Sequence, residues 1–172
     1  SDEFAIPYTD IHLVFTDFCD TILLVHRGQK TVSSTVGHGL LRDNPYATAR
    51  FAQAQENMSA MKSILKSGDL DAFIALVESE ALTLHSLMMS SNPYFILMKP
   101  NTLKIIEAIW AKREKDGVKW CFTLDAGANV HFLYPQADQA AANAFIEKEL
   151  AQYCENGAFI HDEVGMGAER LI

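Results

Sequence analysis

Apolar side chains in the middle of the chain recur at intervals of three and four residues, the spacing of one face of an α-helix. The first set follows Asn44-Pro45, a pair typical of a helix start, with asparagine as N-cap and proline in the first turn. The second set follows Gly68, which suits a left-handed helix end, and Asp69, which can cap the next helix. The two sets are Phe51, Ala54, Met58, Met61, Leu65 and Phe73, Val77, Ala81, Leu84, Met88. We expect two long helices that pack antiparallel across a short turn.

Short runs rich in β-branched and aromatic residues predict strands on either side of these helices. The runs lie at 21–25, 31–36, 118–124, 130–134 and 158–162. Further helices are expected at about 102–115 and 137–153, whereas 10–18 fits either a strand or a short helix. This grouping of strands around helices indicates an α+β fold with a mostly antiparallel sheet and about four helices. We expect a single domain over residues 1–172, since no repeat or low-complexity linker interrupts the pattern.

Composition and charge narrow the function classes. The chain has 172 residues, of which 49% are hydrophobic and 21% charged, as in an ordinary globular protein. A net charge of −8 argues against a protein whose main function is to bind nucleic acid. A single local basic pocket is still compatible with this net charge. No apolar run approaches the ~20 residues of a membrane span, and the start lacks a secretory-signal pattern. We therefore expect a cytoplasmic protein with neither nucleic acid nor a membrane as partner.

Cysteine and histidine spacing offers no metal site. The three cysteines, Cys19, Cys121 and Cys154, form no CxxC pair. We therefore expect reduced thiols rather than a zinc site or disulfides. Histidines 38, 85 and 131 lack the HxxxH and HxH patterns of metal ligands. His85 lies at the edge of an apolar helical stripe, where we interpret it as a helix histidine with a satisfied hydrogen bond.

A segment of three hydroxyls and two glycines, residues 33–39, follows the second predicted strand. Backbone amides near glycine, with hydroxyl donors such as Ser34 and Thr35, can form a cradle for an anion. Serine and glycine are also common where a strand ends in a turn, so the local pattern leaves both interpretations open. Arg42 and Arg50 can face a phosphate bound there or pair with acidic surface groups. The segment is not a P-loop, because the chain lacks GxxxxGK[ST].

The second candidate segment is the loop 125–129, Asp-Ala-Gly-Ala-Asn, after the apolar run 120–124. A carboxylate delivered by a buried strand into a partly dry cleft can accept a proton or orient a hydroxyl. Asp125 can equally cap a hairpin turn that Asn129 closes. The loop alone does not decide between a catalytic and a capping aspartate.

These segments together resemble the C-terminal half of diphosphomevalonate decarboxylase, of the GHMP kinase superfamily. Residues 32–38, Val-Ser-Ser-Thr-Val-Gly-His, are similar to the family's Ser-Ser/Gly-Ser-Thr-x-Gly-Met segment. Residues 122–130, around Asp125-Ala126-Gly127, resemble its Thr-Phe-Asp-Ala-Gly-Pro-Asn-Ala signature. The intervening Leu84-His85, Pro93 and Asn101-Thr102, and the closing 165–167, run in the family's order.

The resemblance implies an ATP-dependent decarboxylation of mevalonate 5-diphosphate to isopentenyl diphosphate, a step of isoprenoid biosynthesis. Asp125 matches the catalytic aspartate, which contacts or deprotonates the 3-hydroxyl of the substrate. Ser34 matches a serine that helps to bind the substrate's phosphates, with Thr35 beside it. Gly127 and Asn129 shape the loop that presents Asp125. His38 in place of methionine and Ala128 in place of proline depart from the family pattern.

The family's ATP loop, rich in glycine and serine, has no counterpart in this sequence. We therefore expect the C-terminal domain of a longer enzyme, with ATP and Mg²⁺ bound mainly by an N-terminal half and with no activity of this domain alone. A phosphomevalonate decarboxylase and a mevalonate 3-kinase are alternatives that the Asp125 loop fits equally well. A non-catalytic binding or dimerisation domain is a further alternative, and a homodimer is compatible with each assignment.

Overall fold

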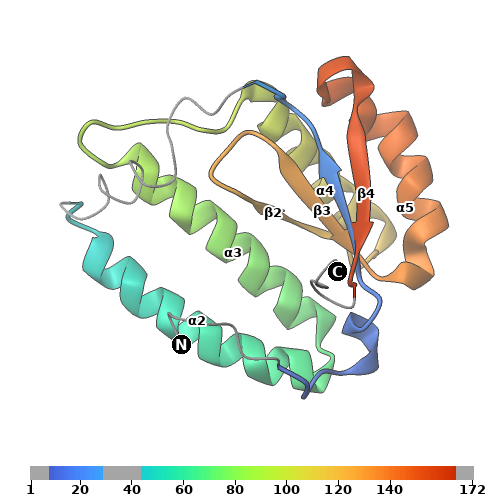
Figure 1. Cartoon of the computed structure of the whole chain (residues 1–172), viewed down its shortest axis with the longest axis horizontal. Helices are drawn as coiled ribbons and strands as arrows, with labels where there is room; N and C mark the ends of the chain where they lie inside the picture. The colour runs from blue at the N-terminus through green and yellow to red at the C-terminus, as the bar shows by residue number, and fades with distance from the viewer. Residues whose placement is uncertain (1–7, 29–43, 166–172) are drawn as a thin grey trace, which may run out of the picture.

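The computed structural model describes residues 8–28 and 44–165, and its centre is a four-stranded sheet (Figure 1). The strands are β1 (Cys19–Leu23), β2 (Cys121–Leu124), β3 (Val130–Tyr134) and β4 (Phe159–Glu163). They are ordered β2-β3-β1-β4, and every neighbouring pair is antiparallel. The expected α+β class and the β2–β3 hairpin are confirmed, whereas the expected strand at 31–36 lies outside the described residues.

Four α-helices surround this sheet (Figure 1). They are α2 (Ala47–Ser67), α3 (Leu70–Met89), α4 (Pro100–Asp116) and α5 (Gln139–Phe145). Short helical turns are η1 (Leu13–Phe15), η2 (Gln136–Asp138), η3 (Ile146–Leu150), η4 (Ala151–Tyr153) and η5 (Glu155–Gly157). In this view α4 lies behind the sheet and α5 to the right of β4. Helix α3 packs along β2, and α2 lies outermost against α3.

The helix ends follow the local sequence signals with one exception. Gly68 takes the left-handed conformation at φ 77°, and the Asp69 carboxylate caps α3 by accepting a hydrogen bond from the Ala72 amide at 3.0 Å. The prediction of Asn44 as the N-cap of α2 is wrong, because the helix begins at Ala47 after Tyr46. Asn44 is instead buried in the preceding turn, where its Nδ2 donates to the Leu87 carbonyl at 2.9 Å.

The predicted helix at 137–153 is interrupted rather than continuous. After α5 one turn is π-helical over Ile146–Leu150, and the last turn, Ala151–Tyr153, is a 3-10 helix. Phe145, Ile146 and Leu150 are nevertheless all buried. The apolar pattern therefore identified a buried helical segment but not its local hydrogen-bond geometry.

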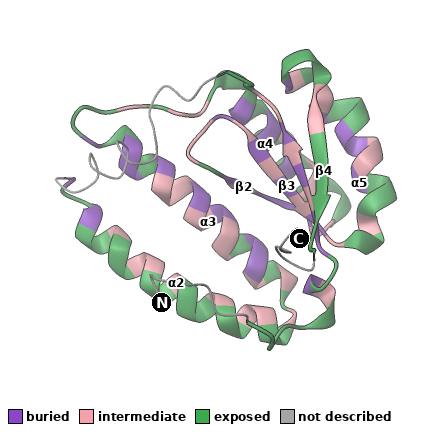
Figure 2. Cartoon of the chain, in the orientation of Figure 1, coloured by how far each residue is buried: buried purple, intermediate pink, exposed green. Residues whose placement is uncertain are grey.

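The two faces of the sheet differ in chemistry because side chains alternate along each strand. One face carries buried groups that pack against α4 and α5, including Phe122, Val130, Phe132 and Leu23. The opposite face carries His131 and Leu133 of β3 and Asp20 and Ile22 of β1, which are only partly buried. This second face is the one seen in Figure 2, and α3 covers it on the β2 side.

Helix α2 buries less of its predicted stripe than expected. Met61 and Leu65 pack against a core cluster around Phe73, but Phe51 is 54% and Met58 60% exposed. Helix α2 is mostly green and pink in Figure 2, in keeping with its position outside α3. The outermost helix therefore contacts the core with only part of its apolar stripe.

Helix α3 is, by length and composition, the one described helix that is apolar enough to cross a membrane. Its apolar residues contribute to all three core clusters of the domain. It also carries the buried Glu78, whose carboxylate accepts hydrogen bonds from Arg113 at 2.7 and 2.9 Å and from Trp110 Nε1 at 2.8 Å. Arg113 further donates to the Trp120 carbonyl at 2.8 Å, so the network joins α3, α4 and the start of β2.

The substitution Glu78→Ala should lower the free energy of unfolding by about 3 kcal/mol, because it leaves a largely buried guanidinium without its partner. The matched control is Glu107→Ala on the same network's helix α4, where Glu107 pairs with Lys104 at 3.7 Å on the surface. That control should change stability by less than about 1 kcal/mol. Denaturant unfolding of both variants measures the difference, and equal effects would contradict a stabilising role for the buried pair.

Candidate functional site

The loop between β2 and β3 carries Asp125 at the turn of the hairpin. The apolar strand β2 ends at the buried Leu124, and the next residue, Asp125, is exposed. Among the described residues, none forms a hydrogen bond or an ion pair with the Asp125 carboxylate. A carboxylate held at a strand end without a partner is able to accept a proton or orient a hydroxyl group.

The backbone of Asp125, by contrast, is firmly held. Its carbonyl oxygen accepts a hydrogen bond from the Gly127 amide at 2.7 Å and lies 3.1 Å from His85 Nε2. His85 is 1% exposed on α3, and this burial lowers the pKa of its imidazole. Since a carbonyl can only accept, the neutral ring must carry its proton on Nε2 and donate it to Asp125. The expected satisfied histidine is confirmed, and its partner is the backbone of the candidate catalytic residue.

Three further contacts fix the rest of the loop. The buried Thr102 hydroxyl, at the start of α4, donates to the Ala128 carbonyl at 2.6 Å. Asn129 Oδ1 accepts a hydrogen bond from the His26 amide, after β1, at 2.9 Å. Ala126 packs against the core cluster that includes Leu87 of α3. The loop is thus tied to α3, α4 and the chain following β1, which orients Asp125 without occupying its carboxylate.

The other predicted site residues have different positions. Gly127 and Asn129 belong to the same loop, and a Cβ atom on Gly127 would meet no atom within 4 Å. Gly127 is therefore not required by close packing or by a positive φ. Asn129 supports the loop through its hydrogen bond to His26. Ser34 and Thr35 lie outside the described residues, so their distance from Asp125 is not defined.

The sequence allows two roles for Arg50, phosphate binding or pairing with an acidic group. Its guanidinium is paired with the Glu80 carboxylate, which joins α2 to α3. The pairing interpretation therefore holds for Arg50. Within residues 8–28 and 44–165, no group of three histidine, cysteine or acidic side chains is placed to hold a metal ion.

A polar pair on the partly covered face of the sheet was missed by the sequence analysis. Asp20 of β1 and His131 of β3 lie 2.8 Å apart, Oδ2 to Nδ1. The hydrogen bond to Asp20 raises the pKa of His131, and the negative charges of Asp20, Asp125 and Asp162 act in the same direction against partial burial. A carboxylate inside the apolar run of a central strand was the signal that could have identified this pair.

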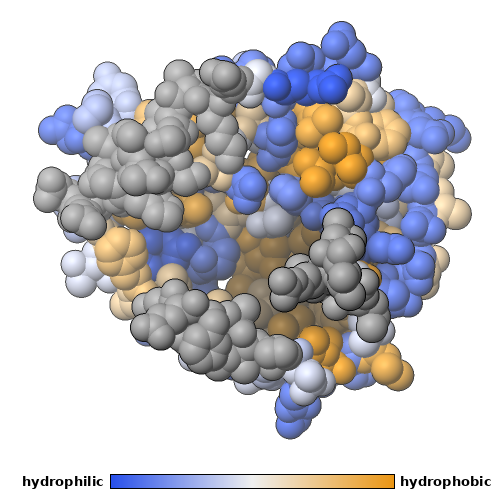
Figure 3. Space-filling model, in the orientation of Figure 1, coloured by the Kyte–Doolittle hydropathy of each residue, from blue (hydrophilic) through white to orange (hydrophobic). Residues whose placement is uncertain are grey.

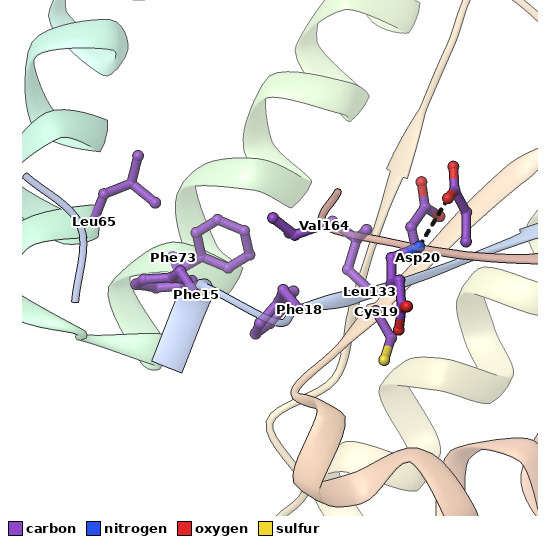
Figure 4. Close-up of a pocket in the computed structure, with 10 residues that line it drawn as sticks. Phe15, Phe18, Cys19, Asp20, Leu65, Phe73, Leu133 and Val164 are labelled. Atoms are coloured by element: carbon purple, nitrogen blue, oxygen red, sulfur yellow. Dashed lines mark hydrogen bonds between the residues drawn. The ribbon is translucent and has the colours of Figure 1, made fainter. Parts of the chain in front are cut away.

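A cavity of about 350 Å³ opens on the same face of the sheet (Figure 4). Phe15, Phe18, Phe73 and Leu133 form its apolar wall, while Asp20 and acidic residues of β4 line its other side. The space-filling view shows this face hollowed between α3 and the strands, with apolar groups on the floor (Figure 3). The cavity therefore offers space for a ligand on the face that carries Asp20. The loop that carries Asp125 does not line it.

The variant His85→Leu should be less stable than wild type by about 1 kcal/mol at pH 7, because it removes the donor to Asp125. The pKa of His85 is lowered in the folded protein, so below its ordinary value of 6.5 the unfolded chain binds more protons than the folded one. Wild type therefore loses stability from this residue as the pH falls, and the gap to His85→Leu should narrow between pH 7 and pH 5. Denaturant unfolding at both pH values measures it. His85→Gln, which keeps a donor, should be closer to wild type at pH 7, and a gap that widens on acidification would contradict this account.

Comparison with known proteins identifies the family of this chain. Residues 21–167 match the family described as the mevalonate 5-diphosphate decarboxylase C-terminal domain. The phosphomevalonate decarboxylase of Haloferax volcanii is 28% identical over 118 residues, which cover 66% of this chain and 36% of that protein.

Two solved structures share the fold at lower identity. Mevalonate diphosphate decarboxylase from Staphylococcus aureus has a TM-score of 0.80 at 22% identity, over 94% of this chain and 48% of its own. The structure of MDDEF in complex with MVAPP, AMPPCP and magnesium has a TM-score of 0.75 at 21% identity, over 85% and 43%. The chain spans less than half the length of each of these three relatives. The family match covers most of the sequence and includes the Asp125 loop, and the chain therefore belongs to the mevalonate 5-diphosphate decarboxylase C-terminal domain family.

Proposed function

We propose that this chain supplies the catalytic carboxylate of an ATP-dependent decarboxylase that acts on mevalonate 5-diphosphate. The products of the reaction are isopentenyl diphosphate, carbon dioxide, ADP and phosphate. The observation that carries the proposal is the Asp125 loop, in which the backbone is anchored on three sides and the carboxylate is exposed. The family match over residues 21–167 supports the same assignment.

The proposed mechanism gives Asp125 two tasks. It first accepts a hydrogen bond from the tertiary 3-hydroxyl of the substrate and takes its proton as the oxygen attacks the terminal phosphoryl group. The resulting 3-phosphate then leaves with its bonding electrons as the carbon–carbon bond to the carboxylate breaks and carbon dioxide departs. Asp125 then releases the proton to solvent, and its regenerated carboxylate would stabilise the positive charge that develops on the tertiary carbon during this step. His85 and Thr102 hold the loop so that the carboxylate keeps one position through both steps.

ATP with Mg²⁺ supplies the phosphoryl group in this proposal and is bound mainly by residues outside this chain. The complex of MDDEF with MVAPP, AMPPCP and magnesium supports that choice of cosubstrate. Ser34 and Thr35 are proposed to contact the phosphates of the substrate, as the matching family segment implies. The open space over Gly127 allows a ligand to approach the backbone of the loop.

Phosphomevalonate decarboxylase activity is the second candidate. The relative from Haloferax volcanii carries that name and is 28% identical, above the two solved structures described here. The chemistry at the 3-hydroxyl would be the same, and only the number of phosphates at the far end of the substrate would differ. Asp125 has the same two tasks in both reactions.

The substitution Asp125→Asn in the full-length protein should lower turnover by about 10²-fold or more, since it removes the proton acceptor but keeps the shape of the side chain. The exposed side chain accepts no hydrogen bond from the described residues, so the melting temperature should change little. Carbon dioxide and ADP release measure the rate. The control is Asp71→Asn, an exposed aspartate at the start of α3, which should retain activity. Near-normal turnover of Asp125→Asn would contradict the catalytic role and favour a capping one.

The substitution Ser34→Ala should mainly raise the Michaelis constant for the phosphorylated substrate. Loss of one hydrogen bond to a charged group corresponds to a rise of about tenfold or somewhat more. Initial rates over a range of substrate concentrations separate this effect from a change in turnover. An unchanged Michaelis constant would remove Ser34 from the proposed phosphate contacts.

A further inference from the structure

The pair formed by Asp20 and His131 has a geometry that a purely structural ion pair does not explain. Asp20 Oδ2 accepts the hydrogen bond from His131 Nδ1 at 2.8 Å, while Asp20 Oδ1 is buried and has no partner among the described residues. A partly exposed ion pair contributes little to stability, whereas an unsatisfied buried polar atom is destabilising. The pair therefore adds little net stability, and an unsatisfied group of this kind calls for another role.

The register of the sheet places this pair beside the candidate catalytic residue. His131 lies directly opposite Thr123 of β2, and Asp125 is two residues beyond Thr123. His131 also lies opposite Ile22 of β1, and Asp20 is two residues from Ile22. Asp20 is thus a diagonal neighbour of His131 in the ladder, with Cα atoms about 7–8 Å apart. Asp125 lies in the loop just after β2, and its negative charge acts on His131. His131 therefore lies between two carboxylates. Asp20 accepts its hydrogen bond, and Asp125 is the proposed catalytic group.

The hydrogen bond to Asp20 determines which nitrogen of His131 remains free. A carboxylate accepts, so Nδ1 carries a proton and donates it to Asp20, which leaves Nε2 for another partner. Nε2 has no hydrogen bond to the described residues, and the side chain is 21% exposed. We propose, on the basis of the proposed function, that His131 uses Nε2–H to bind an anionic group of the substrate, a phosphate or the carboxylate, next to Asp125.

His131 lies among negatively charged side chains on this face of the sheet. A substrate with phosphates and a carboxylate must approach a chain of net charge −8, and Asp20, Asp125 and Asp162 all act on His131. An imidazolium among these carboxylates offers the anion a local favourable contact and a charged hydrogen bond. His85 of α3, which contacts the Asp125 carbonyl, adds no positive charge here, because burial lowers the pKa of its imidazole. The protonated form of His131 is the one that binds an anion.

The pH dependence follows from the raised pKa of His131. Binding through the imidazolium is fully present below the ordinary histidine value of 6.5 and is lost as the pH rises through the pKa in the folded protein. Replacing Asp20 with Asn removes the first cause of the upward shift and should move that loss to lower pH. This displacement is a readout that a merely structural pair would not produce in ligand affinity.

The test measures the affinity of the full-length protein for two probes, inorganic pyrophosphate and mevalonate, as a function of pH. Mevalonate carries the carboxylate without a phosphate, so the two probes distinguish the two sources of the anion. His131→Gln should weaken one of them about tenfold or more at pH 6, while His131→Lys should retain binding and extend it to higher pH. The matched control is His161→Gln, an exposed histidine on β4 on the opposite face of the sheet.

The outcomes separate this inference from the proposed function. A weaker affinity for pyrophosphate in His131→Gln assigns His131 to a phosphate of the substrate. A weaker affinity for mevalonate assigns it to the carboxylate. Unchanged affinity for both probes in a folded His131→Gln protein would overturn the inference, even if Asp125→Asn abolishes decarboxylation. Conversely, a His131-dependent affinity in a protein whose turnover does not need Asp125 would support the anion site and contradict the catalytic proposal. NMR titration of the His131 ring in wild type and in Asp20→Asn should show the lower pKa in the variant, and an unchanged value would contradict the role of Asp20.

Discussion

The hydrogen bond between the buried His85 and the carbonyl oxygen of Asp125 links the core of this domain to the loop that carries the candidate catalytic residue. It requires α3 to lie along β2, and the ion pair of Glu78 with Arg113 fixes that helix against α4. The loop after β2 is then fastened at its middle by Thr102 and at its end by Asn129. A loop backbone held in this way limits the positions that the exposed Asp125 carboxylate can take.

The two faces of the sheet differ in burial and polarity. Phe122, Phe132 and Leu23 bury one face against α4 and α5 and form the main core. The other face holds Asp20 and His131, with a cavity of about 350 Å³ beside them. Because neighbouring residues on a strand point to opposite faces, changes at His131 can alter binding without direct disturbance of the main core.

Much of the fold was predictable because it depends on local signals. The antiparallel helices, the glycine at the end of α2, the Asp69 cap and the β2–β3 hairpin follow from periodicity and turn residues that are adjacent in the sequence. The exposure of Phe51 and Met58 was not predictable, since it depends on which helix lies outermost. The candidate residue Asp125 was identified from its loop. The contact of His85 with Asp125, by contrast, joins residues 40 positions apart, and the Asp20–His131 pair joins residues 111 positions apart. The carboxylate within the apolar run of β1 marks Asp20 as unusual, but no local pattern identifies the distant partner in either contact.

The most direct test of the account is to incubate the full-length protein with ATP, Mg²⁺ and carboxyl-labelled mevalonate 5-diphosphate or mevalonate 5-phosphate and to measure labelled carbon dioxide. The account predicts release from one of these two substrates, dependent on ATP and accompanied by equal amounts of ADP and phosphate. Release of ADP with no carbon dioxide from either substrate would identify a kinase in place of a decarboxylase. The absence of both products would contradict the assignment of Asp125 to this reaction.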